Sequence, residues 1–478
     1  MFPTSSRSPR SLREGWPALL GLSAVFLVEM LDNSILNVAL PTIGRELHAS
    51  ATSLQWVTGS YAVVFGSLML FFGAVADRFG RRRIMLTGLV MLGLASLATG
   101  FVTNTAELTA VRAAMGVAAA MTTPGSMALA FRLFADDALR VRAMTLISTV
   151  GLVGLAVGPT VGGLVLAVAP WQVLLLVNAP IAVVALAGVR FGIAADHDLH
   201  RAPLDLAGAA LATTTIVAAL VAPTLFVSGT PLAWVVLAAA VVGAGLFLLR
   251  ERSARHPLLD LALVAHPLVA GGLAFKAAAG LATAGLSYLV ALQLQLDWGW
   301  PPALAALGMA PQVVVLIAGG LFVNPFVQRV GLERAGYLSA VAVVAGLAVY
   351  GALGRFGYGW VAISLALVAA GLRVVGVVAA VNVMRGLPEN RTTIGAALTD
   401  TVTQVSSGTG VAVAGTVLAA IFAGSLTASG WTTAQTGQFH LAVTVAGLTL
   451  TAMAAALVGW GFLRTRAVNT IATQPTAP

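Results

Sequence analysis

The chain has 478 residues, of which 59% are hydrophobic and only 9% are charged. A water-soluble domain of this length does not carry so much apolar surface, so the composition predicts an all-α polytopic membrane protein. The sequence has no cysteine, which excludes disulfide and thiolate chemistry. It also has no HExxH pair and no Gly-rich phosphate loop. We therefore expect no metal site, no cofactor and no catalytic residues.

Long apolar runs separated by polar, Gly- or Pro-containing breaks predict fourteen membrane-spanning helices. In chain order they are expected at about 17–40, 54–76, 84–103, 108–130, 142–166, 172–190, 205–225, 232–249, 267–292, 303–324, 335–353, 358–384, 393–422 and 440–463. An even number of spans places both termini on the same side of the membrane. Residues 1–16 are expected to form a cytoplasmic tail rather than a signal peptide, because no small-residue cleavage site follows the first apolar run.

The basic residues predict the orientation of these spans. Of the 26 Lys and Arg residues, only Arg45 and Arg355 fall in predicted outer loops, and only Arg112, Lys276 and Arg373 fall within predicted helices. All the others lie in tails or loops on the side of the termini, so the positive-inside rule places both termini in the cytoplasm. This distribution accounts for the net charge of +9 without nucleic acid as a partner.

The most specific motif of the chain is GAVADRFGRRR at 73–83, in the turn between the second and third expected helices. Its arginines anchor the turn on the cytoplasmic side, Gly73 is expected to allow close helix approach, and Gly80 permits a sharp reversal. The pattern GxxxDRxGRRR resembles the signature loop of the major facilitator superfamily. The resemblance implies two six-helix bundles around a central cavity, which rock between inward-open and outward-open states. The residues that carry the motif, and that are implied to control this movement, are Gly73, Asp77, Arg78, Gly80 and Arg81.

Two carboxylates, Glu29 and Asp32, lie three residues apart in the first expected helix and so share a face near mid-membrane. Ionisable groups are costly there and are candidates for function, the alternative being a structural ion pair with a neighbouring helix. The pattern LDNS…NVALP around them resembles the first-helix signature of the fourteen-span drug:proton antiporters. Arg112 and Gly116 similarly resemble the fourth-helix signature of that family. The resemblance implies that Asp32, Glu29 and Arg112 couple proton transfer to movement, and a charge pair between Asp32 and Arg112 is physically sensible.

The helix expected at 142–166 contains the pattern GxxxGPxxGG. Small residues at this spacing are common wherever membrane helices pack closely. The longer pattern, however, resembles an antiporter signature associated with exporters, which favours export as the direction of transport. The residues that match it are Gly154, Gly158, Pro159, Gly162 and Gly163.

Three more ionisable residues, Lys276, Arg373 and Asp400, fall within expected helices of the second half. Together with Glu29 and Asp32 they are candidates for lining a substrate cavity. In the structural alternative, Asp400 neutralises one of the two cations. In the functional alternative, the cavity offers positive charge to an anionic or zwitterionic substrate. The stretch 320–331, between the tenth and eleventh expected helices, is a faint repeat of the 73–83 turn that lacks its aspartate.

These observations predict five regions: a cytoplasmic tail (1–16), a six-helix bundle (17–190), a linker with two extra spans (191–260), a second six-helix bundle (261–464) and a cytoplasmic tail (465–478). The expected function is proton-coupled export of drugs or antibiotic-like amphipathic compounds. The alternative is export of an acidic or zwitterionic metabolite or lipid that uses Lys276 and Arg373. The expected partners are a small amphipathic substrate, protons and membrane lipids, with the protein a monomer. A strong bias for Arg over Lys favours a high-GC bacterium, and hence the bacterial plasma membrane.

Overall fold

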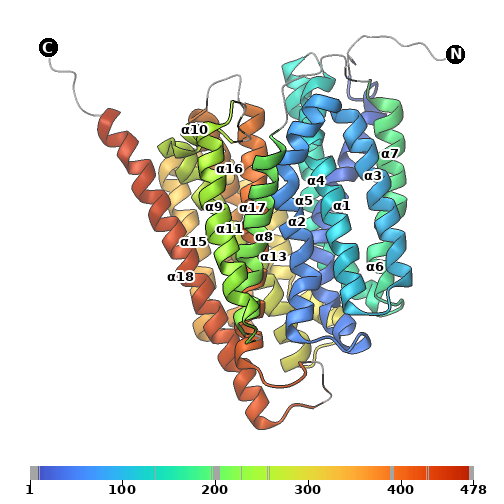
Figure 1. Cartoon of the computed structure of the whole chain (residues 1–478), viewed down its shortest axis with the longest axis vertical. Helices are drawn as coiled ribbons and strands as arrows, with labels where there is room; N and C mark the ends of the chain where they lie inside the picture. Colours follow the sequence, from blue (N-terminus) through green and yellow to red (C-terminus); the bar gives the residue numbers. More distant parts are fainter. Residues whose placement is uncertain are drawn as a thin grey trace.

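The computed structural model describes residues 9, 11–134, 136–194, 196, 205–227, 229–255, 257, 259–387, 392–426, 428 and 430–472. These residues form helices joined by turns and loops, arranged as two bundles that lie side by side (Figure 1). The first helix begins, and the last helix ends, at the same end of the molecule (Figure 1). We call this the inner end, and we call the opposite end the outer end. The start of α1 and the end of α18 lie at one end, which agrees with an even number of membrane crossings.

The first bundle contains seven helices, and polar N-caps explain where several of them begin. Ser50, Asn104 and Asp136 each accept a hydrogen bond from a backbone N–H three residues ahead, which satisfies a donor that the helix itself leaves free. The helix expected at 172–190 is divided in two at Val177. The elements are α1 (Trp16–Glu46), α2 (Ala51–Phe79), α3 (Arg81–Ala98) with a 3-10 turn (Thr99–Phe101), α4 (Thr105–Leu133), α5 (Asp137–Leu166), α6 (Gln172–Leu176) and α7 (Asn178–Gly192).

The rest of the chain forms a helix pair and the second bundle. The elements are α8 (Leu206–Val227), α9 (Leu232–Ser253), α10 (Leu261–Ala265), α11 (Pro267–Leu292) with a π turn (Gln293–Asp297), α12 (Pro302–Gly308), α13 (Ala310–Ala318), α14 (Gly320–Val330), α15 (Leu332–Leu353) with a 3-10 turn (Gly354–Phe356), α16 (Tyr358–Arg385), α17 (Thr392–Ile421) and α18 (Thr433–Ala472). The tail expected from residue 465 is therefore helical as far as Ala472, because α18 continues beyond the predicted span.

Within the described residues, eleven helices are long and apolar enough to cross a membrane. Two more spans are bent: α1 by 41° between Trp16–Asp32 and Ser34–Glu46, and α2 by 51° between Ala51–Met69 and Phe71–Phe79. The span expected at 303–324 is broken into α12, α13 and α14. A total of fourteen crossings therefore requires these three short helices to cross the membrane together.

The faint repeat at 320–331 proves to be a structural one. The tenth helix was expected to end at about residue 324, but residues 320–330 form α14 and only Gly331 makes the turn, with φ 87°. Gly80 makes the matching turn between α2 and α3, with φ 103°. Both positions need this left-handed backbone conformation, which glycine adopts without a steric penalty. The two bundles thus share the same helix–glycine–helix turn, although only the first copy keeps the aspartate.

The two extra helices lie at the join between the bundles. Helix α8 packs against both α2 and α17, and the Gln55 amide donates hydrogen bonds to Thr224 of α8 (3.1 Å) and Thr416 of α17 (3.4 Å). At the inner end, Asp205 accepts hydrogen bonds from the Gly208 N–H (2.9 Å) and the Arg250 guanidinium (3.1 Å). Burial alone would raise the pKa of Asp205, but these two partners outweigh it and hold the pKa below the usual value. The start of α8 is therefore fastened to the end of α9.

Candidate functional site

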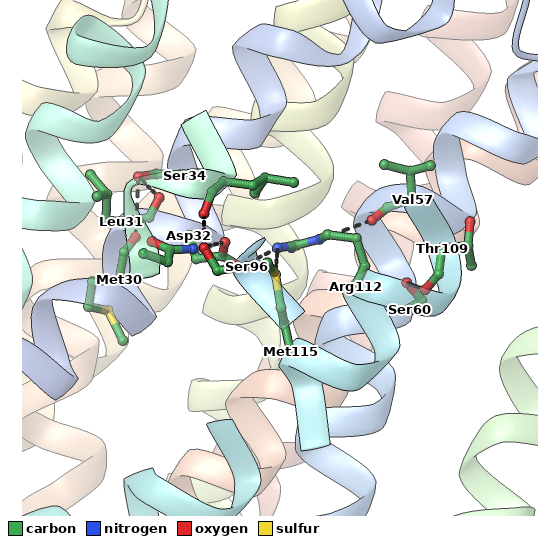
Figure 2. A network of polar contacts seen from close by, with 12 residues as sticks. Met30, Leu31, Asp32, Ser34, Val57, Ser60, Ser96, Thr109, Arg112 and Met115 are labelled. Atoms are coloured by element: carbon green, nitrogen blue, oxygen red, sulfur yellow. Dashed lines mark hydrogen bonds and ion pairs between the residues drawn. The ribbon is translucent and has the colours of Figure 1, made fainter. Parts of the chain in front are cut away.

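A buried ion pair joins α1 to α4 within the first bundle. Asp32 lies at the bend of α1 and is 2% exposed, and Arg112 of α4 is 1% exposed. Arg112 Nη1 donates to Asp32 Oδ2, and Asn178 Nδ2 of α7 donates to the other carboxylate oxygen at 3.0 Å. Figure 2 shows Asp32 and Arg112 facing each other across this contact. Two charges in so apolar a place require each other, since each would be costly alone.

Among the described residues, the other polar and aromatic contacts of Arg112 come from α2 and α4. Its Nε donates to the Val57 carbonyl at 3.3 Å, and its guanidinium carbon lies 4.6 Å from the centre of the Tyr61 ring. Met115 places its sulfur 3.9 Å from Nη1 (Figure 2). A thioether is a weak acceptor. Asp32 is therefore the only negatively charged partner of Arg112 among the residues that the structure describes.

Glu29, one helical turn from Asp32, has different neighbours. It is 5% exposed, and its carboxylate accepts hydrogen bonds from Thr123 Oγ1 of α4 (2.8 Å) and Gln404 Nε2 of α17 (3.4 Å). Its partners thus belong to both bundles, whereas Asp32 is bonded to the first bundle alone. A change in the charge of Glu29 would directly alter a contact between the bundles.

A cavity of about 470 Å³ lies between the bundles. It is lined from α1, α5, α11, α13, α16 and α17, which makes it a central site of the size that holds one small molecule. Four of the sequence-predicted residues line it: Glu29, Lys276, Arg373 and Asp400. Asp32 does not, although it was expected to. Its carboxylate is instead turned into the first bundle, towards Arg112 and Asn178.

The glycine pattern of α5 allows that helix to lie directly against α1. A methyl group added at Gly154 would lie 2.9 Å from a Leu27 methyl carbon and 3.1 Å from the Leu27 carbonyl oxygen, and one added at Gly162 would lie 2.9 Å from the Ile35 side chain. Gly158 faces Ser34 of α1 in the same way, and Pro159 lines the cavity. The stripe therefore has a packing role, and it brings α5 beside the buried carboxylates of α1.

Gly163 continues the pattern but faces the second bundle. A methyl group there would lie 2.5 Å from the Ala306 Cβ and 2.6 Å from the Pro302 carbonyl oxygen of α12. Nearby, Gln295 Nε2 donates to the Val38 carbonyl of α1 at 2.8 Å. We call these contacts of Gly163 and Gln295 with the opposite bundle the outer seam. They hold the two bundles together on the outer side of the cavity.

The turn between α2 and α3 forms a network at the inner end. Asp77 pairs with Arg81 at 2.7 Å and has a side chain 47% exposed. Arg78 lies against the Phe79 ring, 5.5 Å from its centre. The expectation for Gly73 was wrong, since a methyl group there would meet only Pro124 at an ordinary 3.8 Å. The close approach of α2 and α4 occurs instead at Gly116, where a methyl group would lie 2.7 Å from the Tyr61 carbonyl oxygen.

Several residues of the site were not predicted. Thr123 and Gln404, the partners of Glu29, are ordinary polar residues in apolar helices and carry no motif. Asn178 lies in the stretch 171–180, which resembles the family's entry to its sixth helix, but no site role was predicted for it. Asp196, which follows α7 by four residues, accepts a hydrogen bond from the Arg82 N–H (3.0 Å) and lies 3.6 Å from the Arg132 guanidinium. It ties the connection that follows the first bundle to the 73–83 turn.

Comparison with known proteins agrees with this architecture. The sequence pattern of the Major Facilitator Superfamily matches residues 22–411. The cephamycin export protein of Amycolatopsis lactamdurans is 36% identical over 351 residues, which cover 70% of this chain and 69% of that protein. The multidrug efflux pump LfrA of Mycolicibacterium smegmatis is 28% identical over 91% of this chain and 86% of its own. A bacterial homologue of the lysosomal transporter Spinster, solved in an inward-facing state, superposes with a TM-score of 0.67 at 16% identity, over 95% of this chain and 98% of its own.

Proposed function

The chain belongs to the Major Facilitator Superfamily and is a multi-pass membrane transporter, and we propose that it exports drugs or antibiotic-like amphipathic compounds in exchange for protons. The observation that carries this proposal is the buried Asp32–Arg112 pair beside the cavity between the bundles. Intramembrane ionisable residues mark substrate and proton pathways. Relatives named as export and multidrug efflux proteins support the direction of transport and the class of substrate.

Asp32 is the proposed proton carrier. In the structure the charge of Asp32 is balanced by Arg112, and its second carboxylate oxygen accepts a hydrogen bond from Asn178. A proton on Asp32 would neutralise the carboxylate and leave the Arg112 guanidinium, which cannot lose its own proton, without a counterion. Arg112 would then be drawn towards other acceptors, and α1 would be free to move relative to α4. Proton uptake and helix movement are coupled through this one contact.

The proposed cycle alternates between two arrangements of the bundles. Opening outwards requires the outer seam to separate, at Gly163 against α12 and at Gln295 against Val38. In the outward-open state, Asp77 would face the N-terminal end of α17, whose partial positive charge favours a carboxylate. Arg81 already holds Asp77 in place and would support this contact. The inner end, where α1 begins and α18 ends, is assigned to the cytoplasm by the distribution of arginines.

Proton flux in lipid vesicles tests this proposal. The purified protein would be reconstituted with an imposed pH gradient, and proton release would be followed with a trapped pH-sensitive dye as tetraphenylphosphonium is added. We expect saturable proton movement with the intact protein and none with Asp32→Asn. Transport of the probe with no accompanying proton movement would refute proton coupling. Proton movement that persists in Asp32→Asn would remove Asp32 from the carrier role.

A further inference from the structure

Several uncharged polar side chains that line the cavity are already hydrogen-bonded to backbone carbonyls. The hydroxyls of Thr283 and Thr403 each donate to a carbonyl one turn back in their own helices, both at 2.8 Å. Ser34 bonds in the same way within α1, and Ser407 of α17 donates to the Gly280 carbonyl of α11 at 3.4 Å. A hydroxyl has a single proton to donate, so none of these groups has one left for a ligand.

The Asn37 amide differs from these hydroxyls. It lines the cavity from α1 and is 5% exposed, and its oxygen is buried with no hydrogen-bond partner among the described residues. In that part of the chain its NH2 group has no partner either. A half-turn about the Cβ–Cγ bond exchanges the oxygen and the NH2 group, so the side chain can present a donor or an acceptor to the cavity. A buried amide is unfavourable while it stays unpaired, so a ligand that pairs with it gains affinity.

A second amide lines the cavity from the opposite bundle. Gln312 of α13 accepts a hydrogen bond from the Ser287 hydroxyl of α11 through its Oε1 atom, at 3.4 Å. Within the described ranges no hydrogen bond occupies the NH2 group of Gln312. Ser287 therefore holds one end of this amide and leaves its two N–H donors for a ligand.

Both amides lie next to the outer seam. Asn37 directly precedes Val38, whose carbonyl accepts the seam hydrogen bond from Gln295. The Val38 side chain packs in one apolar cluster with Met309, which also lines the cavity. The Gln312 backbone N–H donates to the Met309 carbonyl at 3.1 Å, so Gln312 lies one turn along α13 from this contact. The seam thus closes the outer side of the cavity, with an amide from each bundle beside it.

We infer that Asn37 and Gln312 form a subsite for an uncharged group that both donates and accepts hydrogen bonds, such as the carboxamide of an amphipathic substrate. The N–H of that group would donate to the Asn37 oxygen, and its carbonyl would accept from the Gln312 NH2 group. This inference rests on the proposed function in one respect, namely that the cavity is the substrate site. It goes further in naming a recognised group without charge and the residues that bind it. Because these residues belong to opposite bundles, opening of the outer seam would separate them and release the group.

Equilibrium binding of two fluorescent probes of the same shape tests this subsite. One is 6-dimethylamino-2-naphthamide, and the other is 6-acetyl-2-dimethylaminonaphthalene, in which a methyl group replaces the amide NH2. Both are uncharged at neutral pH, and their fluorescence reports transfer out of water, so binding to the protein in lipid nanodiscs can be followed against empty nanodiscs. The ratio of the two dissociation constants is compared between variants, because the hydration and lipid partition of each probe are the same for every variant.

Asn37→Leu keeps the approximate shape of the side chain and removes its hydrogen bonds. We expect it to shift the ratio of the amide and ketone dissociation constants by about threefold to tenfold in favour of the ketone. Gln312→Met should weaken both probes, because both lose the donor to their shared carbonyl. Thr283→Val is the matched control, since its hydroxyl bonds to its own helix, and it should leave the ratio unchanged.

Stability measurements separate recognition from packing. Asn37 has no hydrogen-bond partner to lose among the described residues, so Asn37→Leu should leave the free energy of unfolding unchanged or raise it. An unchanged ratio, a destabilised Asn37→Leu protein or the absence of saturable binding would each overturn the assignment. No pH gradient is present in this experiment. A protein that fails the proton-flux test can therefore still show the amide preference, and a protein that passes it can still lack that preference.

Discussion

Removing the charge of Asp32 should destabilise the first bundle by leaving Arg112 buried without a counterion. Breaking a buried pair by removing one partner typically costs about 3–5 kcal/mol. The Asp32→Asn amide oxygen can still accept a hydrogen bond from Arg112, and the Tyr61 ring contributes a cation–π contact. We therefore expect a cost near the lower end of this range, about 3 kcal/mol.

The partners of the pair are not equivalent, and this asymmetry makes the prediction sharper. Arg112→Met removes the guanidinium, but Asp32 keeps the hydrogen bond from Asn178 and can be neutralised by taking up a proton. Its cost should therefore be smaller than that of Asp32→Asn. In the double variant no unbalanced charge remains, so it should be more stable than the sum of the single costs implies, by about 1–3 kcal/mol.

Unfolding in mixed micelles of dodecyl maltoside and increasing SDS, followed by circular dichroism, measures these free energies. Asp77→Asn is the matched control, because the Asp77 side chain is 47% exposed and ion pairs at the surface contribute about 0–1 kcal/mol. If the destabilisation of the double variant equals the sum of the two single destabilisations to within about 0.5 kcal/mol, Asp32 and Arg112 do not interact energetically. That result would refute the reasoning from burial, and with it the coupling role built on this pair.

Three further predictions follow from other contacts. Gly163→Ala should slow transport at least about tenfold, because its methyl group would lie 2.6 Å from the Pro302 carbonyl oxygen and would force the outer seam apart. Gly59→Ala is the control, because its new methyl group would meet no neighbouring atom within 4 Å, and it should leave the transport rate unchanged. If both variants transport at the same rate, close packing at Gly163 does not control transport. Asp77→Asn should abolish transport while substrate binding persists, and undiminished transport by well-expressed protein would contradict the role given to the 73–83 turn. The depressed pKa of Asp205 should stabilise the α8–α9 pair above the unfolded Asp pKa, about 3.9, and this stabilisation should be lost as the pH falls through the lower folded pKa. Hydrogen exchange at the inner ends of α8 and α9, followed as a function of pH, measures this stabilisation. If the Asp205→Asn protein shows the same pH dependence, Asp205 is not its source.

Much of the fold could be predicted because membrane spans depend on local composition. A run of about 20 apolar residues is sufficient to recognise one, and motif resemblance then supplies the family. Broken spans are harder, because α12, α13 and α14 are divided at Met309 and Gly319 without a charged or polar interruption. Pro311 and the Gly319–Gly320 pair lie at these breaks, but proline also occurs inside the unbroken helices α4 and α5, so such residues do not by themselves predict where a span is divided.

The sequence predicted a site residue only where that residue is energetically unfavourable inside a membrane helix and therefore conspicuous. Glu29, Asp32 and Arg112 stand out because charges are rare within membrane helices. Thr123 and Gln404 do not, because hydroxyl and amide side chains occur throughout these helices. Asp32 and Glu29 also share one helix face, so the sequence could not separate a residue that lines the cavity from one turned into the bundle. In the structure the Asp32 carboxylate is turned towards Arg112 and Asn178 while Glu29 lines the cavity, and these orientations depend on the neighbouring helices.

In the proposed mechanism, the different neighbours of the two carboxylates of α1 give them different tasks. Asp32 bonds to α4 and α7, so its protonation changes contacts within one bundle. Glu29 bonds to α4 and α17, so its charge affects the contact between bundles, and it also faces the cavity. A substrate cation that draws Glu29 away from Gln404 would loosen the join between the bundles. A proton on Asp32 would at the same time release α1 from Arg112. Because the two residues lie one helical turn apart on α1, both events act on the same helix, and this gives substrate and proton a short physical path by which each can influence the other.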